Sequence, residues 1–124
     1  MLFLVRSEAT IPSALTMEEA APMLEKTWEM LERHEKEGKI VAGGRVAGTR
    51  FAYFVVDVNS PDELDEMFAS SPMYNYVDLE IMPLTSISSA LQRVREWTRA
   101  HPGETQSGDQ GTPRIGQQGE WPAV

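Results

Sequence analysis

The sequence predicts an α+β fold in which two helices cover one face of a four-stranded antiparallel sheet. Three observations predict it: the elements follow the order β-α-β-β-α-β, both internal helices begin at capping motifs, and one strand is apolar throughout. The chain has 124 residues, a length typical of a single domain. We expect residues 1–84 to form this domain, residues 85–101 an extra helix, and residues 102–124 a glycine- and proline-rich tail.

The first strand and the first helix are marked by pattern and capping. Residues 2–7 are short, apolar and nearly alternating, which is typical of a strand. Thr16 and Glu19 fit a capping box, and apolar residues then recur at the spacing of one helix face. Pro22 predicts a kink or a later start, because it lacks an N–H and clashes with the preceding turn. Gly38 is a natural helix terminator.

A hairpin follows the first helix. Residues 39–47 predict a second strand that Gly43 and Gly44 weaken, and Gly48 predicts the turn. We interpret these glycines as strand flexibility and a turn, although they also leave space for a ligand against the sheet. Residues 50–58 predict a third strand that is apolar on both faces. Such a strand is expected to be covered on both sides.

The second half of the domain repeats the helix-strand pattern. Ser60, Pro61 and Glu63 predict a capped helix start, and Pro72 lies beyond its end. A fourth strand is predicted from alternation over residues 76–82. One of its faces is apolar, and the other carries Tyr76, Asp78, Glu80 and Met82.

This order of elements is that of the ferredoxin-like plait. In that fold two helices cover one sheet face and leave the other bare, so the doubly apolar third strand predicts a second subunit on the bare face. A third amphipathic helix is expected before Pro102 and Gly103. Beyond it, the candidate residues for anchoring the tail are Arg114, Ile115 and Trp121.

Charge and cysteine content exclude several classes of function. The chain has 19 acidic and 11 basic residues, a net charge of −8, which opposes binding to nucleic acid or to an anionic membrane surface. The sequence has no cysteine, so disulfides, zinc ribbons and thiol nucleophiles are excluded. We find no apolar run of membrane-spanning length and no secretion signal, and we expect a cytoplasmic protein.

Two carboxylates on the fourth strand are the candidate catalytic residues. Asp78 and Glu80 are two residues apart, so they lie about 6–7 Å apart on one strand face. One can accept a proton that the other returns, and burial against a partner sheet would raise their pKa values. The alternative is a polar face that meets solvent or forms salt bridges.

Candidate binding residues lie on or beside the predicted strands. Arg6, Arg45 and Arg50 carry guanidinium groups that could hold a substrate carboxylate, or instead pair with acids across the sheet. Tyr53 and Tyr76 could line a ligand space, although strand aromatics are usually core. The two histidines, His34 and His101, favour solvated or helix-capping roles, and they indicate no metal site.

The distribution of particular residues resembles that of a known family. The first six residues resemble the opening strand of that family, where a basic residue also occupies the place of Arg6. The hairpin and the last strand align with the family without gaps at Glu37, Gly38, Arg45–Gly48, Tyr53, Asp57, Val58, Pro72, Tyr76, Asp78 and Glu80. On these residues the chain resembles the muconolactone isomerase family over positions 1 to about 84.

This resemblance implies a dimeric α+β barrel, often assembled into larger rings. It also implies a cofactor-independent isomerase that moves a proton on a small unsaturated lactone acid. Asp78 and Glu80 would supply the acid and base, and arginines such as Arg6 and Arg45 would hold the substrate carboxylate.

The chain departs from the family on two strands. The family carries aromatic, histidine and arginine side chains where this chain has residues 41–44, and a histidine in place of Leu4. A wider, more apolar site favours a bulkier ligand, such as a polyketide-like intermediate that is rearranged or cyclised in secondary metabolism. The alternative is a non-catalytic ligand-binding or scaffold protein on the same fold.

Overall fold

The computed structural model describes residues 1–103 and divides the chain into two units, Met1–Leu84 and Thr85–Val124. Each unit is described by itself. The candidate tail anchors Arg114, Ile115 and Trp121 lie outside the described residues.

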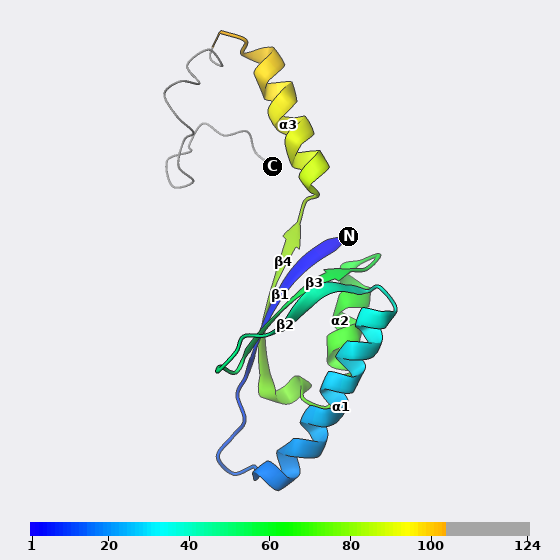
Figure 1. Ribbon diagram of the computed structural model, residues 1–124, viewed down its shortest axis with the longest axis vertical. Coiled ribbons are helices and arrows are strands. Elements are labelled where there is room, and N and C mark those ends of the chain that lie inside the picture. Colours follow the sequence, from blue (N-terminus) through cyan, green and yellow to red (C-terminus); the bar gives the residue numbers. More distant parts are fainter. Residues whose placement is uncertain (104–124) are drawn as a thin grey trace. The chain divides into compact units, whose positions relative to one another are not determined.

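The first unit has the predicted α+β architecture (Figure 1). Its elements are β1 (Leu2–Ala9), α1 (Met17–Lys36), β2 (Ile40–Arg45), β3 (Phe51–Asp57), α2 (Pro61–Ala69), the short 3-10 helix η1 (Tyr74–Tyr76) and β4 (Val77–Leu84). The four strands form one antiparallel sheet in the order β2-β3-β1-β4. This is the expected plait, with β1 as a central strand and β2 and β4 at the edges.

Both helices of this unit lie on one side of the sheet, and the core lies between them and the strands (Figure 1). β1 contributes Phe3 and Val5 to this core, and β3 contributes Ala52, Phe54 and Val56. From the helices come Met30, Leu31, Leu64, Met67 and Phe68. Burial of this apolar surface is the main favourable contribution to folding.

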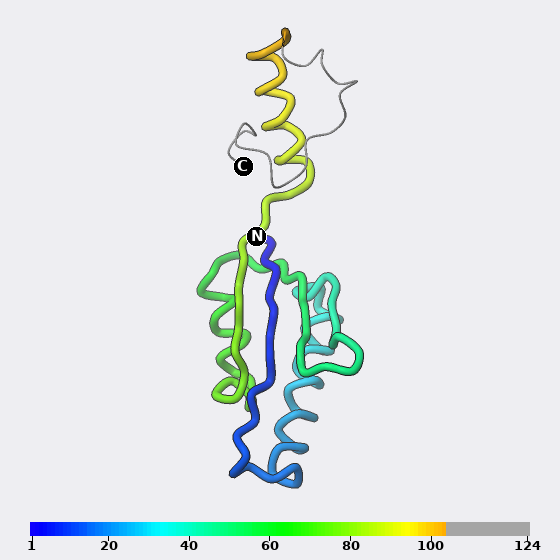
Figure 2. The backbone as a smooth tube through the Cα atoms, turned by 90° about the vertical axis from the view of Figure 1, so that its left-hand side faces the viewer, coloured from blue at the N-terminus to red at the C-terminus, as the bar shows by residue number. Residues whose placement is uncertain are grey.

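The other face of the sheet is not covered by any element of the Met1–Leu84 unit (Figure 2). We call it the open face. Partners in the strand register share a side of the sheet, which assigns the residues of this face. They are Leu2, Leu4, Arg6 and Glu8 on β1, Phe51, Tyr53 and Val55 on β3, and Asp78, Glu80, Met82 and Leu84 on β4. The apolar third strand therefore has one face in the core and one on the open face.

The predicted capping motifs are confirmed. The Thr16 side chain accepts a hydrogen bond from the Glu19 backbone N–H at 3.2 Å, and its hydroxyl donates to the Glu19 carboxylate at 3.0 Å. Ser60 caps α2 by accepting from the Glu63 N–H at 3.1 Å. With its start fixed in this way, α1 begins at Met17 and runs through Pro22, so the later start does not occur.

Each of the four strands differs from its predicted bounds by one or two residues at one or both ends, and two of these differences have a clear structural cause. β4 begins at Val77, because residues 74–76 form a 3-10 turn whose Tyr76 N–H bonds to the Met73 carbonyl at 2.8 Å. β2 ends at Arg45, and its register slips between Ile40 and Ala42. Such a bulge inserts one unpaired residue into the strand and reverses the alternation of side chains beyond it.

Gly43 is required by the backbone of β2. Its φ of +144° lies in a region that favours glycine, and an added Cβ would meet the carbonyl oxygen of Tyr53 and lie 2.8 Å from the Phe54 Cα. Gly44 has an ordinary φ, and a Cβ there would meet no atom within 4 Å. The two neighbouring glycines therefore have different reasons to be glycine.

This difference can be measured by substituting each glycine with alanine. We expect Gly43→Ala to lower the free energy of unfolding by about 1–3 kcal/mol, because the strand must strain or move. Gly44→Ala is the matched control, and its effect should stay within about 1 kcal/mol. Urea unfolding followed by circular dichroism gives both values, and equal losses would contradict the assignment.

The described part of the second unit contains helix α3 (Ile87–Ala100), which Ser86 caps by accepting from the Ser89 N–H at 3.0 Å. His101 ends the helix, and its ring stacks on Trp97 with 4.5 Å between ring centroids. Its Nδ1 also lies 3.0 Å from the carbonyl oxygen of Trp97, which fits the helix-capping alternative of the two roles that the sequence favours for His101.

Candidate functional site

The strand register gathers four of the six predicted site residues on the open face. Arg6 of β1 pairs with Glu80 of β4 on one side and with Tyr53 of β3 on the other. One pair further along, Glu8 of β1 stands beside Asp78 of β4. Because cross-strand partners lie about 4.5–5.5 Å apart, these side chains form one group across β3, β1 and the edge strand β4.

Arg6 is held in place by two neighbours. Its Nη1 lies 3.5 Å from Oε2 of Glu80, and its guanidinium carbon lies 4.4 Å from the centroid of the Phe51 ring. The Arg6 side chain is 28% exposed and the Glu80 side chain 64% exposed, so solvent screens this ion pair. The ring and the carboxylate orient the guanidinium and leave part of it accessible from the open face.

The surroundings of this group are apolar. Leu4 and Val55 are partners across the sheet, and Met82 is the other partner of Leu4. At the β2 edge, the partners of Val55 and Tyr53 are Ala42 and Gly44. Three of the positions at which the chain departs from the resembled family therefore lie on this face, namely Leu4, Ala42 and Gly44. Small or apolar residues replace polar ones at these positions.

Two predicted binding residues lie elsewhere. The register pairs Arg45 with Ala52, whose side chain is in the core, so Arg45 lies on the helix side of the sheet. There its Nη1 donates to the Thr49 carbonyl at 3.2 Å. The bulge in β2 is the cause, since simple alternation from Ile40 would place Arg45 on the open face. Tyr76 lies in η1 and not on the strand that carries Asp78 and Glu80.

Arg50, which the sequence also offers as a strand arginine, lies in the turn before β3. Its carbonyl accepts a hydrogen bond from the Ala9 N–H at 3.2 Å, and the residue is exposed. Of the three candidate arginines, Arg6 alone stands beside the two carboxylates.

A second feature lies on the helix side and is not among the sequence predictions. A hollow of about 260 Å³ lies between α1 and β2. Its lining includes Trp28, Leu31, Glu35, Gly43 and Phe54. A signal for it was present, since residues 28, 31 and 35 share one face of a helix. The opposite wall, formed by the glycine pair on β2, cannot be inferred from the sequence, because it depends on how β2 packs against α1.

The part of the chain that the structure describes contains no group of three or more acidic or histidine residues placed to hold a metal ion. None of its helices has the length and apolar character needed to cross a membrane.

His34 is largely buried, contrary to the solvated role that the sequence favours. Its side chain is 13% exposed, and within the described residues its Nδ1 makes no hydrogen bond and lies 3.7 Å from Oε2 of Glu37. Burial lowers the pKa of His34 below its ordinary value of 6.5, and the nearby Glu37 carboxylate only partly opposes this shift. The histidine is part of the packing at the end of α1, which lies on the other side of the sheet from the open face.

Comparison with known proteins decides the family. The family model described as "Muconolactone delta-isomerase" matches residues 1–90 of this chain. The chain belongs to the muconolactone isomerase family. The match covers the whole unit that carries the Arg6 group and ends early in α3.

Curated members of the muconolactone isomerase family align with nearly their whole length. A muconolactone Δ-isomerase of Rhodococcus opacus is 32% identical over 88 residues, covering 71% of this chain and 95% of the relative. One from Cupriavidus pinatubonensis is 27% identical over 92 residues, covering 74% of this chain and all of the relative.

Comparison with a solved structure supports the same family. A crystal structure of muconolactone isomerase superposes with a TM-score of 0.65 at 28% identity, covering 72% of this chain and 93% of the other. The resemblance in sequence and the ferredoxin-like fold are thus both confirmed. Compared with these relatives, the chain continues beyond the shared unit.

The buried His34 predicts that stability falls on acidification. The unfolded chain takes up a proton on His34 near pH 6.5, whereas the folded chain does so only at lower pH. Protonation therefore favours unfolding, and the free energy of unfolding decreases from pH 7.5 to pH 5.5.

Urea unfolding at the two pH values tests this prediction. His34→Gln should reduce the pH dependence, and His101→Gln, at an exposed position, should leave it unchanged. The same pH dependence in wild type and His34→Gln would contradict the role of His34.

Proposed function

We propose that the open face is the working surface of a cofactor-independent isomerase that moves a proton on an unsaturated, anionic lactone or polyketide-like molecule. The observation that carries this proposal is the position of Arg6 between the Glu80 carboxylate and the Phe51 ring, with Tyr53 and Asp78 alongside. A fixed cation beside two carboxylates suits a substrate that has both a carboxylate and an acidic C–H.

In this proposal Arg6 binds the substrate carboxylate. A guanidinium donates two parallel hydrogen bonds to a carboxylate, which orients the bound molecule as well as attracting it. Part of the Arg6 side chain remains exposed beside Glu80, so a substrate can reach it without displacing the ring of Phe51. Tyr53, 40% exposed on the next strand, offers a hydroxyl that can donate to a lactone carbonyl.

Asp78 and Glu80 are the proposed acid and base. One carboxylate removes a proton from the carbon next to the conjugated system, the double bond shifts, and the proton returns at the far carbon. The substrate is rearranged with no net gain or loss of atoms or electrons, so the reaction requires no cofactor. Their separation of about 6–7 Å along the strand is compatible with transfer between two carbons of one small ring.

The small and apolar residues around the Arg6 group favour a substrate larger than a single lactone ring. Leu4, Ala42 and Gly44 surround the group with apolar and small positions where the family carries polar or bulky ones. A rearrangement or cyclisation in secondary metabolism fits such a site. The same observation supports a second candidate, a non-catalytic ligand-binding or scaffold protein, because polar groups of the family are missing.

We further propose that a second copy of the chain covers the open face and completes the site. The supporting observation is the exposed apolar area around Arg6, including Met82 at 42% and Leu84 at 40% exposure. Exposed apolar patches of this kind mark interaction surfaces. A covered site would exclude water and strengthen the electrostatic contacts of the carboxylates. The cysteine-free sequence supports a location in the cytoplasm.

The amide variants Asp78→Asn and Glu80→Gln test the catalytic roles. We expect each to reduce kcat for muconolactone or a bulkier unsaturated lactone acid by about 100-fold or more, because an amide cannot accept the proton. Asp65→Asn, which changes an exposed carboxylate of α2, is the matched control and should retain activity.

Near-normal rates in both amide variants would contradict these roles. If the wild-type protein binds such lactones without converting them, the non-catalytic alternative replaces the isomerase. Proton NMR of the reaction mixture in D₂O follows both turnover and exchange at the reacting carbons.

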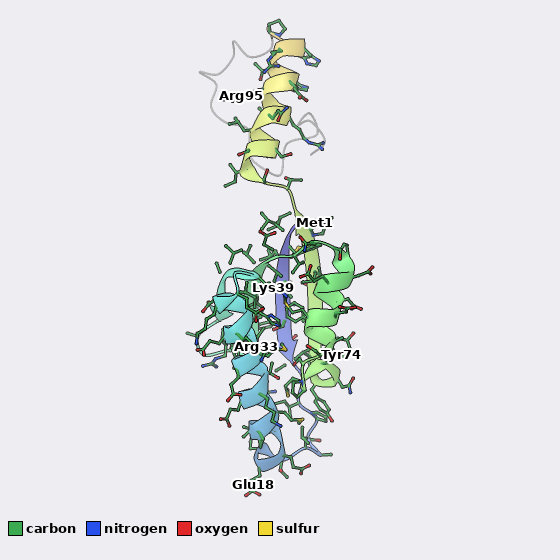
Figure 3. The ribbon with its side chains drawn as sticks, turned by 90° about the vertical axis from the view of Figure 1, so that its right-hand side faces the viewer. Met1, Glu18, Arg33, Lys39, Tyr74 and Arg95 are labelled. Carbon is green, nitrogen blue, oxygen red and sulfur yellow. The ribbon has the colours of Figure 1, made fainter. Side chains whose placement is uncertain are left out.

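The dimer is tested separately by multi-angle light scattering at micromolar concentration. We expect a mass of twice the 13.9 kDa chain, and Leu4→Asp should shift it toward the monomer by placing an unpaired charge in the interface. Glu18→Lys, at an exposed position at the start of α1 (Figure 3), is the control. A wild-type monomer would contradict the covered face.

A further inference from the structure

The hollow between α1 and β2 is a second site with its own chemistry. It has a volume of about 260 Å³, which is the space of about nine liquid water molecules at about 30 Å³ each. It lies on the helix side of the sheet, because Phe54, which lines it, has its side chain in the core on that side. The Arg6 group lies on the opposite face.

The walls of this hollow are apolar and aromatic. Leu31 and Phe54 are 7% and 4% exposed, whereas Trp28 is 38% exposed. The rings of Trp28 and Phe54 are 6.2 Å apart between centroids and inclined by 54°. On the β2 side, Gly43 and Gly44 line the hollow with backbone alone. An exposed indole next to an unfilled apolar space is suited to contact with a further ring.

The charge that lines the hollow is of one sign. Glu32 and Glu35 are its charged lining residues, and no lysine or arginine of the described chain is among them. Glu32 is already paired with Lys36, whose Nζ lies 3.3 Å from its Oε1. Glu35, one helical turn beyond Leu31 on the same helix face, has no ion pair or hydrogen bond of its side chain among the described residues. An anionic ligand would meet only like charge here.

We propose that this hollow binds a small aromatic ring carrying a protonated amine. The ring would pack against Trp28 and Phe54, and the ammonium group would pair with Glu35 and lie near the face of the indole. Cation–π contact and ion pairing favour the same charge. The volume limits the ligand to about one ring with a short alkyl chain. This selectivity is opposite to that of the Arg6 group, so the two faces would bind different ligands.

The test uses three small probes with the same phenylpropyl skeleton and different charge, namely 3-phenylpropan-1-amine, 3-phenylpropan-1-ol and 3-phenylpropionate. Binding is followed on the full-length protein by the shift of the Trp28 indole N–H resonance, which is assigned by its loss in Trp28→Phe. We expect saturable binding of 3-phenylpropan-1-amine with an affinity about tenfold above that of 3-phenylpropionate, corresponding to about 1.4 kcal/mol.

Two variants separate a site from a general charge effect. Glu35→Gln should markedly reduce the preference for the amine while retaining the affinity for the neutral alcohol. Glu29→Gln removes the same charge from a residue of α1 that does not line the hollow, and it should leave the preference intact. Equal affinities for amine and carboxylate in the wild type, equal effects of the two variants, or shifts that do not saturate would overturn the proposal. None of these measurements depends on catalysis at the open face.

Discussion

The pairing register of β1 is the constraint on which both faces of this protein depend. β1 is hydrogen-bonded to β3 on one side and to β4 on the other, and Phe3 and Val5 fix its inward face by burial at 4% and 0% exposure. Because side chains alternate along a strand, a slip of one residue would bury Arg6 beneath the helices. The same burial that stabilises the fold therefore holds the one arginine of the site on the open face.

Much of this arrangement was predictable from local patterns. The capping motifs at Thr16 and Ser60 fixed the starts of α1 and α2, since each uses a short-range hydrogen bond between side chain and backbone. The shared face of Asp78 and Glu80 followed from regular alternation, which holds because β4 has no bulge in its pairing. These features depend on residues close together in the sequence.

Most of the predictions that the structure does not support depend instead on contacts with residues distant in the sequence. Arg45 lies on the helix side because the slip beyond Ile40 reverses the alternation of β2, and that slip is defined by the pairing with β3. Tyr76 is the exception, because its cause is local: its N–H bonds to the carbonyl of Met73 three residues earlier, which forms a turn in place of the first residue of the strand. His34 is polar and lies in a charged segment of α1, yet burial at the end of the helix dominates its titration.

The family relationship and the departures from it are located on the same surface. The unit that matches the muconolactone isomerase family carries Arg6, Tyr53, Asp78 and Glu80 on one face of its sheet. Beside them Ala42 and Gly44 place small residues at the β2 edge. These charged residues and their small or apolar neighbours are the basis of the proposal that the chain moves a proton on a different molecule.

The most direct test of this account is a crystal structure of the protein with a bound unsaturated lactone carboxylate. The account predicts that the ligand lies on the open face, with its carboxylate on the Arg6 guanidinium and its ring within reach of Asp78 and Glu80. A ligand carboxylate bound elsewhere, such as near Arg45 on the helix side of the sheet, with the Arg6–Glu80 pair left undisturbed, would contradict it.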